Sequence, residues 1–102
     1  MYNSTKKNYF VYILCSKRNG TLYIGITSDL NRRAQEHRAK LIPGFTQKYS
    51  VVHLVYFEAF DSAMNAIRRE KCLKEWCRSW KLQLIEKSNP TWQNLFTLET
   101  ID

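Results

Sequence analysis

The sequence predicts an α+β fold, a small three-stranded antiparallel sheet flanked by helices in the order β-β-α-β-α-α. Two apolar, β-branched segments around an Asn-Gly turn indicate a hairpin, and a similar segment further along indicates a third strand. Apolar residues at helical spacing lie between and after these strands. With 102 residues, 44% of them hydrophobic, the chain is expected to form a single domain, residues 1–102, around one core.

The first two strands are predicted within the first 26 residues. Residues 9–15, YFVYILC, have the aromatic and β-branched composition of a buried strand. Residues 16–20 end in Asn-Gly, the strongest short hairpin signal, and residues 21–26 return as the second strand. The two strands are therefore expected to pair antiparallel. Residues 51–57, VVHLVYF, are expected to form the third strand.

The first helix is located by its flanking residues. The segment 27–29, Thr-Ser-Asp, offers N-cap residues, and residues 30–40 have the periodicity of a helix. Leu30, Ala34 and Leu41 share one apolar stripe, and Pro-Gly at 43–44 ends the helix before a polar loop.

Two more helices are expected in the second half. Asp61 precedes a helical pattern from near Ser62 to about Ser79, and a shorter helix is expected over residues 80–87. Asn-Pro at 89–90 breaks it, so the core spans about residues 9–90. The tail, residues 91–102, is expected to dock as a short segment. Its anchors are Trp92, Leu95 and Phe96.

The charge balance indicates a polyanionic partner. Sixteen Lys and Arg against nine Asp and Glu give a net charge of +7, which favours nucleic acid. The alternative is that the positive charge serves only solubility. No apolar run approaches the roughly 20 residues that cross a bilayer, and no helix has the apolar face of a membrane-surface helix. We therefore expect no membrane partner.

The cysteines and the N-terminus indicate a cytoplasmic protein. Cys15, Cys72 and Cys77 form neither an even set nor a CxxC motif, so they are expected to be reduced packing residues. Neither a disulfide nor a zinc site is supported. The polar N-terminus, residues 1–7, does not have the pattern of a signal peptide.

Two tyrosines and two basic residues are candidates for a site. Tyr12 and Tyr23 lie one on each strand of the hairpin, and both can reach one rim of the sheet, although a strand tyrosine is usually a packing residue. Arg33 and His37 are four residues apart and share a helix face. Because His37 borders the packed stripe, it either packs with satisfied hydrogen bonds or contacts a phosphate.

Glu70 lies inside the apolar stripe of the predicted helix over residues 62–79. The stripe consists of Ala63, Ala66, Ile67, Leu73, Cys77 and Trp80. An uncompensated buried carboxylate costs several kcal/mol, so Glu70 must be paired or bind a cation. An ion pair with Arg33 or Arg69 and a metal site are therefore the two alternatives.

The ordered set of these residues resembles the GIY-YIG nuclease superfamily. The set comprises Phe10-Val11-Tyr12, Tyr23-Ile24-Gly25, Arg33, His37 and Glu70. The second triplet is present in full, whereas the first departs from Gly-Ile-Tyr and retains only its tyrosine. The resemblance covers roughly residues 9–90 and is greatest to the small bacterial proteins of the UPF0213 type. Their Arg-Glu helix motif is similar to Arg69-Glu70-Lys71, and residues 89–92, NPTW, also resemble that group.

This resemblance implies an endonuclease that hydrolyses DNA phosphodiester bonds with one divalent metal, Mg²⁺ or Mn²⁺. Glu70 would hold the metal, Arg33 the phosphate, and Tyr12 and Tyr23 share the role of base. His37 is carried over as a catalytic residue, and Asn89, in competition with Asn94, as the family's asparagine. Structure-selective cleavage in repair or recombination is the expected use, with RNA as another substrate and a protein partner for targeting.

A basic helix face is expected to bind the nucleic acid. Lys71, Lys74, Arg78 and Lys81 follow Glu70 at helical spacing and could track a phosphate backbone, although a solvated face is the usual fate of such charges. The runner-up function is a nucleic-acid-binding protein with little or no cleavage. A third interpretation, aromatic strands that stack single-stranded bases, does not explain Glu70.

Overall fold

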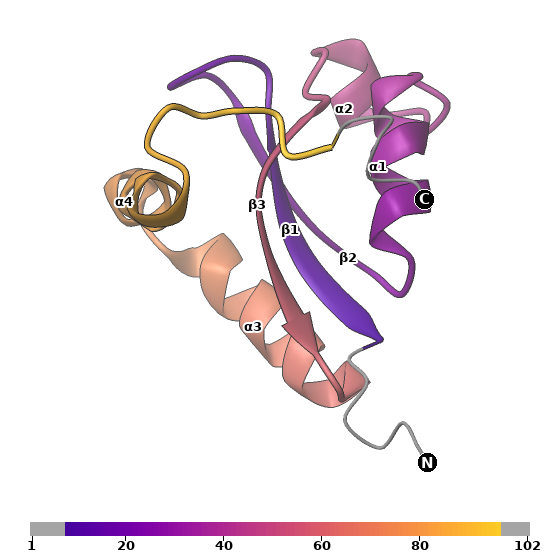
Figure 1. Ribbon diagram of the computed structural model, residues 1–102, viewed down its shortest axis with the longest axis vertical. Coiled ribbons are helices and arrows are strands. Elements are labelled where there is room, and N and C mark those ends of the chain that lie inside the picture. The colour runs from indigo at the N-terminus through magenta and orange to yellow at the C-terminus, as the bar shows by residue number, and fades with distance from the viewer. Residues whose placement is uncertain (1–7, 97–102) are drawn as a thin grey trace.

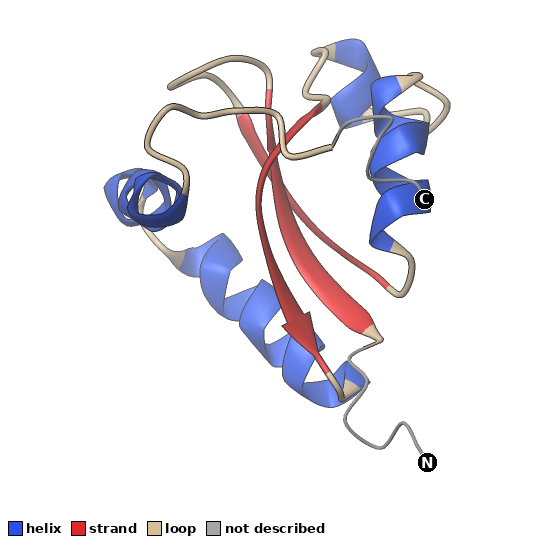
Figure 2. Cartoon of the chain, in the orientation of Figure 1, coloured by secondary structure: helices blue, strands red, loops and turns tan. Residues whose placement is uncertain are grey.

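The computed structural model describes residues 8–96 and confirms the α+β fold (Figure 1). Its elements are β1 (Tyr9–Cys15), β2 (Leu22–Thr27), α1 (Leu30–Arg38), α2 (Phe45–Lys48), β3 (His53–Phe60), α3 (Ala63–Glu75) and α4 (Arg78–Ser88). The strands form one antiparallel sheet in the order β2-β1-β3. Helices α1 and α2 lie on one side of this sheet, and α3 and α4 lie on the other (Figure 2). None of these helices is long and apolar enough to cross a membrane.

Strand β1 lies at the centre of the sheet and contributes side chains to two core clusters. Because successive side chains in a strand point to opposite faces, Val11 and Ile13 pack toward α3 and α4. Tyr12 and Leu14 pack toward α1 and the C-terminal tail. Both faces are covered, which is why β1 is a continuous apolar run.

The predicted hairpin is present, and α4 holds its turn. Asn19 adopts a left-handed backbone with φ 59°, which asparagine tolerates better than most residues. The guanidinium of Arg78 donates hydrogen bonds to the carbonyls of Asn19 and Gly20, both at 2.7 Å. The turn is thereby fixed by a residue almost 60 positions away in sequence.

The prediction of one helix from Ser62 to Ser79 is wrong, because the chain breaks between α3 and α4. Trp76 and Cys77 have extended backbones with ψ of 147° and 160°. The break lets α4 change direction, so that Ile85 is buried in the same core cluster as Leu73 of α3. Lys71 and Lys74 therefore lie on α3, and Arg78 and Lys81 on α4, so they do not form one continuous helix face.

The short helix α2 was not expected. It occupies the segment predicted as a polar loop, and the element order is therefore β-β-α-α-β-α-α. The helix over residues 30–40 ends two residues early, at Arg38, which leaves Leu41 exposed instead of on the apolar stripe. The third strand is shifted toward residue 60.

Several expected packing residues are exposed. Ala66 and Leu73 of the predicted stripe are buried, but Ile67, Cys77 and Trp80 are not. Cys77 and Trp80 lie beyond the end of α3, so an unbroken stripe cannot include them. Ile67 lies within α3, so there the buried stripe is narrower than predicted. Cys15 is a buried packing residue as expected, whereas Cys72 and Cys77 are exposed; all three are free thiols.

The C-terminal tail docks on the sheet with its anchors inside. Trp92 and Phe96 are buried, and Leu95 packs against the cluster that contains Phe96. Residues 97–102 of the predicted tail, and the polar segment 1–7, lie outside the described residues.

Candidate active site

Tyr12 occupies a space that Gly25 leaves open. Tyr12 sits in the middle of β1, directly opposite Gly25 on β2, and is only 2% exposed. A Cβ atom at position 25 would collide with the hydroxyl and the Cζ of the Tyr12 phenol. The glycine of the Tyr-Ile-Gly triplet is therefore required for the position of the first tyrosine, and the two triplets form one structural unit.

A buried hydrogen-bond chain links the sheet to α1 and α2. The Tyr12 hydroxyl lies 3.1 Å from His37 Nε2, and His37 Nδ1 lies 3.1 Å from Thr46 Oγ1. His37 and Thr46 are both buried, so both ring nitrogens have protein partners. A neutral imidazole donates through one nitrogen and accepts through the other, and a hydroxyl at each end suits either tautomer. His37 is thus not free to contact a phosphate.

Burial is the main influence on the protonation of His37 and Tyr12 in this hydrogen-bond chain. Burial, and then the positive charge of Arg33, lower the pKa of His37 below its ordinary value of 6.5, so the imidazole is neutral at pH 7. Burial, and then the neighbouring Tyr23, raise the pKa of Tyr12 to about 12, although the charge of Arg33 acts in the opposite direction. Tyr12 therefore keeps its proton at neutral pH.

Tyr23 is the more accessible tyrosine. Its ring centroid lies 6.4 Å from that of Tyr12 and 5.8 Å from that of His37, and it stacks on Phe45 of α2. Tyr23 also lines a hollow at the open edge of β2. The other lining residues are Leu22, Ile24, Phe45, Lys74 and Lys81. The two tyrosines lie close together as expected, but Tyr12 is buried on the central strand and only Tyr23 faces this hollow.

Arg33 places a partly unused guanidinium beside the tyrosines. Its Nε lies 3.3 Å from Glu36 Oε1, yet the N–H does not point at that oxygen. Among residues 8–96, this Nε is a buried polar side-chain atom without a hydrogen-bond partner. A buried N–H donor costs free energy unless an acceptor takes its hydrogen bond. A phosphate oxygen is a suitable acceptor.

Glu70 is shielded, as its position in the stripe predicts, but its partner was not predicted. Its side chain is 14% exposed and pairs with Nζ of Lys74, one turn along α3, at 2.7 Å. The expected partners are engaged elsewhere. Arg69 makes two 2.9 Å hydrogen bonds to Glu58, and Arg33 pairs with Glu36. Both alternatives named for a structural ion pair are therefore wrong.

The donor set fits a hard cation that keeps most of its water. No cluster of three or more His, Cys, Asp or Glu residues occurs within residues 8–96, so Glu70 would hold a cation with at most one other ligand of these types. Mg²⁺ is commonly held by one or two carboxylates together with substrate phosphates. Lys74 is 53% exposed and can swing away from Glu70 into solvent or toward a phosphate. Glu70 can therefore hold such an ion together with a substrate.

Asn89 and Asn94 lie away from this group. The Asn89 amide donates to the carbonyls of Val55 and Gln93, and its oxygen accepts from the Gln93 amide. Asn94 accepts from the backbone amides of Leu54 and Phe96. Both asparagines fasten the tail to β3, the edge of the sheet opposite β2. These hydrogen bonds give Asn89 a structural role.

The four predicted nucleic-acid contacts have different surroundings. Lys74 and Lys81 line the hollow beside Tyr23, and Lys71 is exposed on α3. Arg78 is occupied by the hairpin turn. The structure thus brings two of the four lysine and arginine side chains to the tyrosine that faces the hollow.

Two residues of this site were not identified from the sequence. Thr46 orients His37, and Phe45 stacks on Tyr23, but both lie in a segment that reads as a polar loop. No local signal marks them. The Lys74 partner of Glu70 did have a signal, since glutamate followed by lysine at i+4 is a favourable helical pair.

The fold and this arrangement define a GIY-YIG domain, and comparison with known proteins agrees. The family described as the GIY-YIG catalytic domain matches residues 8–83. A UPF0213 protein of Haloquadratum walsbyi is 40% identical over 80 residues, which cover 78% of this chain and 88% of that protein. A UPF0213 protein of Staphylococcus aureus is 37% identical over 81 residues, covering 78% of this chain and 96% of the relative.

A solved structure supports the same assignment. The solution NMR structure of a UPF0213 protein from Bacillus halodurans superposes with a TM-score of 0.54 and 31% identity, covering 88% of this chain and 95% of that one. The chain belongs to the GIY-YIG family and is a small protein of the UPF0213 type. GIY-YIG domains are nuclease domains that act on DNA and generally use a divalent metal. The names of the UPF0213 relatives state no activity.

Proposed function

We propose that this chain is a metal-dependent endonuclease that hydrolyses DNA phosphodiester bonds in the hollow at the edge of β2. The supporting observation is the cluster formed by Tyr12, Tyr23 and His37, whose ring centroids lie within 6.4 Å of one another beside Arg33. This cluster holds one accessible candidate base, Tyr23, next to a cation. Hydrolysis of a phosphate diester needs both kinds of group.

Arg33 and Lys74 provide the positive charge for the phosphate. Arg33 has a buried Nε–H without an acceptor, and its planar fork suits two phosphate oxygens. Lys74 lines the same hollow as Tyr23 and is released from Glu70 when that carboxylate takes a cation. Both cations would offset the charge that builds up on the phosphate in the transition state.

The two tyrosines have different roles in this proposal. Tyr23 faces the hollow, so its oxygen, as a phenolate that has already given its own proton to solvent, is placed to take the proton of the attacking water. The ammonium of Lys74, which lines the same hollow, would stabilise the negative charge of that phenolate. Tyr12 is buried and has a raised pKa of about 12, so it keeps its proton. The hydrogen-bonded residues Tyr12, His37 and Thr46 would form a fixed packing surface that orients the ring of Tyr23.

Glu70 would hold the metal, for which Mg²⁺ and Mn²⁺ are the candidates. When bound, a hard divalent cation neutralises charge on the phosphate and stabilises the leaving 3′ oxygen. Structure-selective cleavage in repair or recombination, a protein partner that delivers the enzyme, and a cytoplasmic location complete the proposal. DNA is preferred to RNA on family membership alone.

A nucleic-acid-binding protein without cleavage is the second candidate. The observation in its favour is the 2.7 Å pair between Glu70 and Lys74, because this pair must open before Glu70 can take a cation. The experiment that decides is a comparison of Tyr23→Phe with Tyr12→Phe on labelled single-stranded, duplex and branched DNA. We expect Tyr23→Phe to lose cleavage and retain binding, and Tyr12→Phe to keep part of the activity. Binding without cleavage by the wild-type protein on every DNA, in Mg²⁺ and in Mn²⁺, would support the second candidate.

A further inference from the structure

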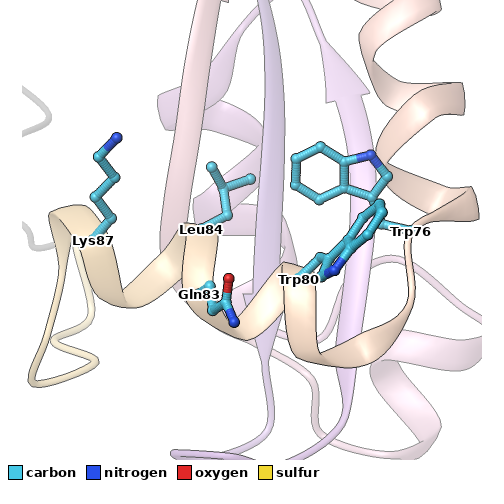
Figure 3. A pocket seen from close by; sticks show the side chains of 5 residues that line it. All are labelled: Trp76, Trp80, Gln83, Leu84 and Lys87. Atoms are coloured by element: carbon cyan, nitrogen blue, oxygen red, sulfur yellow. The ribbon is translucent and has the colours of Figure 1, made fainter.

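Two tryptophans form an exposed aromatic hollow at the junction of α3 and α4. The Trp76 and Trp80 rings meet edge to face with centroids 5.7 Å apart, and Trp80 is 55% exposed. Figure 3 shows both rings where α3 meets α4, with Gln83, Leu84 and Lys87 along the same hollow. An indole left this open is unusual for a core residue, since burying it would stabilise the fold.

Trp76 is held in place by an arginine of α3. The guanidinium of Arg69 lies 5.1 Å from the centre of the Trp76 ring, a cation–π distance. Arg69 is itself held by two hydrogen bonds to Glu58 of β3. Trp76 is thus fixed to the sheet, and Trp80 rests against it. A preorganised aromatic surface loses little entropy when a flat ring stacks on it.

The charges around this surface favour an anionic ligand. Lys87 lines the hollow, and Lys81 follows Trp80 directly on α4. The carboxylate of Glu86 accepts a hydrogen bond from the Trp92 indole, which holds it to the tail. Glu75, which precedes Trp76 in the sequence, does not line the hollow. Aromatic rings bordered by lysines are typical of surfaces that stack bases and bind the phosphates between them.

The first turn of α4 connects this hollow with the candidate active site. Lys81 lines the hollow that contains Tyr23, and Trp80 is the residue before it. A strand held at the edge of β2 and bound by Lys81 therefore lies next to Trp80 along α4. A single nucleic-acid strand is long enough to occupy both places.

We propose that the hollow of Trp76 and Trp80 is a second nucleic-acid contact, at which Trp80 stacks an unpaired base of a strand whose backbone passes Lys81 and Lys87. The inference rests on the proposed function for the kind of ligand, but not for the chemistry. Bases in a duplex are already stacked, so the contact adds affinity only for strands with unpaired bases. It therefore gives the protein a preference for single-stranded over duplex DNA.

The test compares Trp80→Ala and Trp80→Phe with the wild-type chain in Mg²⁺-free buffer. Affinity is measured by fluorescence anisotropy for an oligothymidylate of about 12 nucleotides and for a duplex of the same length. Trp80→Ala should weaken binding of the single strand by about 5- to 100-fold and leave the duplex unchanged. Trp80→Phe should restore part of the loss. Ile67→Ala, which removes another exposed apolar side chain from α3, is the matched control and should change neither affinity.

A second readout uses the intrinsic fluorescence of the indoles. The oligothymidylate should quench the wild-type emission, and the part contributed by Trp80 should be missing in Trp80→Phe. Equal single-strand affinities for the wild type and Trp80→Ala, with no quenching, would overturn the inference and leave the hollow as a face for a protein partner. Cleavage depends on Tyr23 and Glu70 in our proposal, so it would survive that result. Unchanged cleavage in Tyr23→Phe, with the Trp80-dependent quenching intact, would instead contradict the proposed function and leave this inference standing.

Discussion

Substituting Gly25 with alanine is expected to push Tyr12 away from His37. The three nearest atoms to a Cβ at this position all belong to Tyr12: the hydroxyl, Cζ and, at 3.0 Å, Cε1. The phenol is buried between β2 and α1 and has no room to retreat, so the case is one of overpacking, which costs about 1–3 kcal/mol. For a domain of this size, this corresponds to a fall in the melting temperature of about 5–20 °C.

Circular dichroism melting of Gly25→Ala, Tyr12→Phe and the double variant measures this effect. Tyr12→Phe removes the hydroxyl, so in that background Gly25→Ala should cost less, and the double-mutant cycle should show a coupling energy of about 0.5–3 kcal/mol. Cleavage should fall with Gly25→Ala even at temperatures where the variant is folded, because the displaced Tyr12 no longer orients the ring of Tyr23. A Gly25→Ala protein that melts with the wild type, and additive variants in the cycle, would refute the close contact between these residues.

The other predictions concern Arg33, Arg78, Lys81 and Glu58. Arg33→Lys should lower turnover far more than DNA affinity, since lysine keeps the charge but loses the two-pronged contact; equal losses in both would make Arg33 an ordinary backbone contact. Lys81→Ala should reduce the slope of log affinity against log salt by about one. Arg78→Ala should leave that slope nearly unchanged. Because Arg78 anchors the hairpin turn, its loss should lower the free energy of unfolding in urea by about 1 kcal/mol. Burial acts to raise the pKa of Glu58, but hydrogen bonds from Arg69 and Tyr56 and the charge of Arg69 outweigh it and hold that pKa below 4.5. The stability from this carboxylate is therefore present above pH 4.5 and lost as the pH falls below it, so Glu58→Gln should be less sensitive to acid in that range than the wild type.

The sheet could be predicted because its signals are local. The apolar run of residues 9–15 and the Asn-Gly turn define β1 and the hairpin with no information from the rest of the chain. The separation of α3 from α4 could not be predicted, because residues 75–80, EWCRSW, contain neither the glycine nor the proline that usually signals a helix end. The break arises from tertiary packing, which buries Ile85 beside Leu73. Helix α2 is likewise held by contacts that are distant in sequence, chiefly those of Thr46 with His37 and of Phe45 with Tyr23.

The candidate site was predictable as a set of positions but not as a network. Helical periodicity predicted that Glu70 is shielded, yet the choice between Lys74 and Arg69 depends on where Glu58 lies across the sheet. The side-chain hydrogen bonds of Asn89 give another example. Its amide is committed to Val55 and Gln93, and nothing in its sequence neighbourhood reveals those partners.

Metal-dependent cleavage by wild-type protein and by Glu70→Gln tests the central claim most directly. Both proteins would be incubated with single-stranded, duplex and branched DNA in Mg²⁺, in Mn²⁺ and in a chelator. Because Lys74 is largely exposed, its charge stays hydrated without Glu70, and the variant should fold as the wild type does. We predict cleavage by the wild type that stops in the chelator, and a Glu70→Gln protein that binds DNA as well or better but does not cut it. Cleavage by Glu70→Gln at the wild-type rate, or wild-type cleavage that persists in the chelator, would contradict the account.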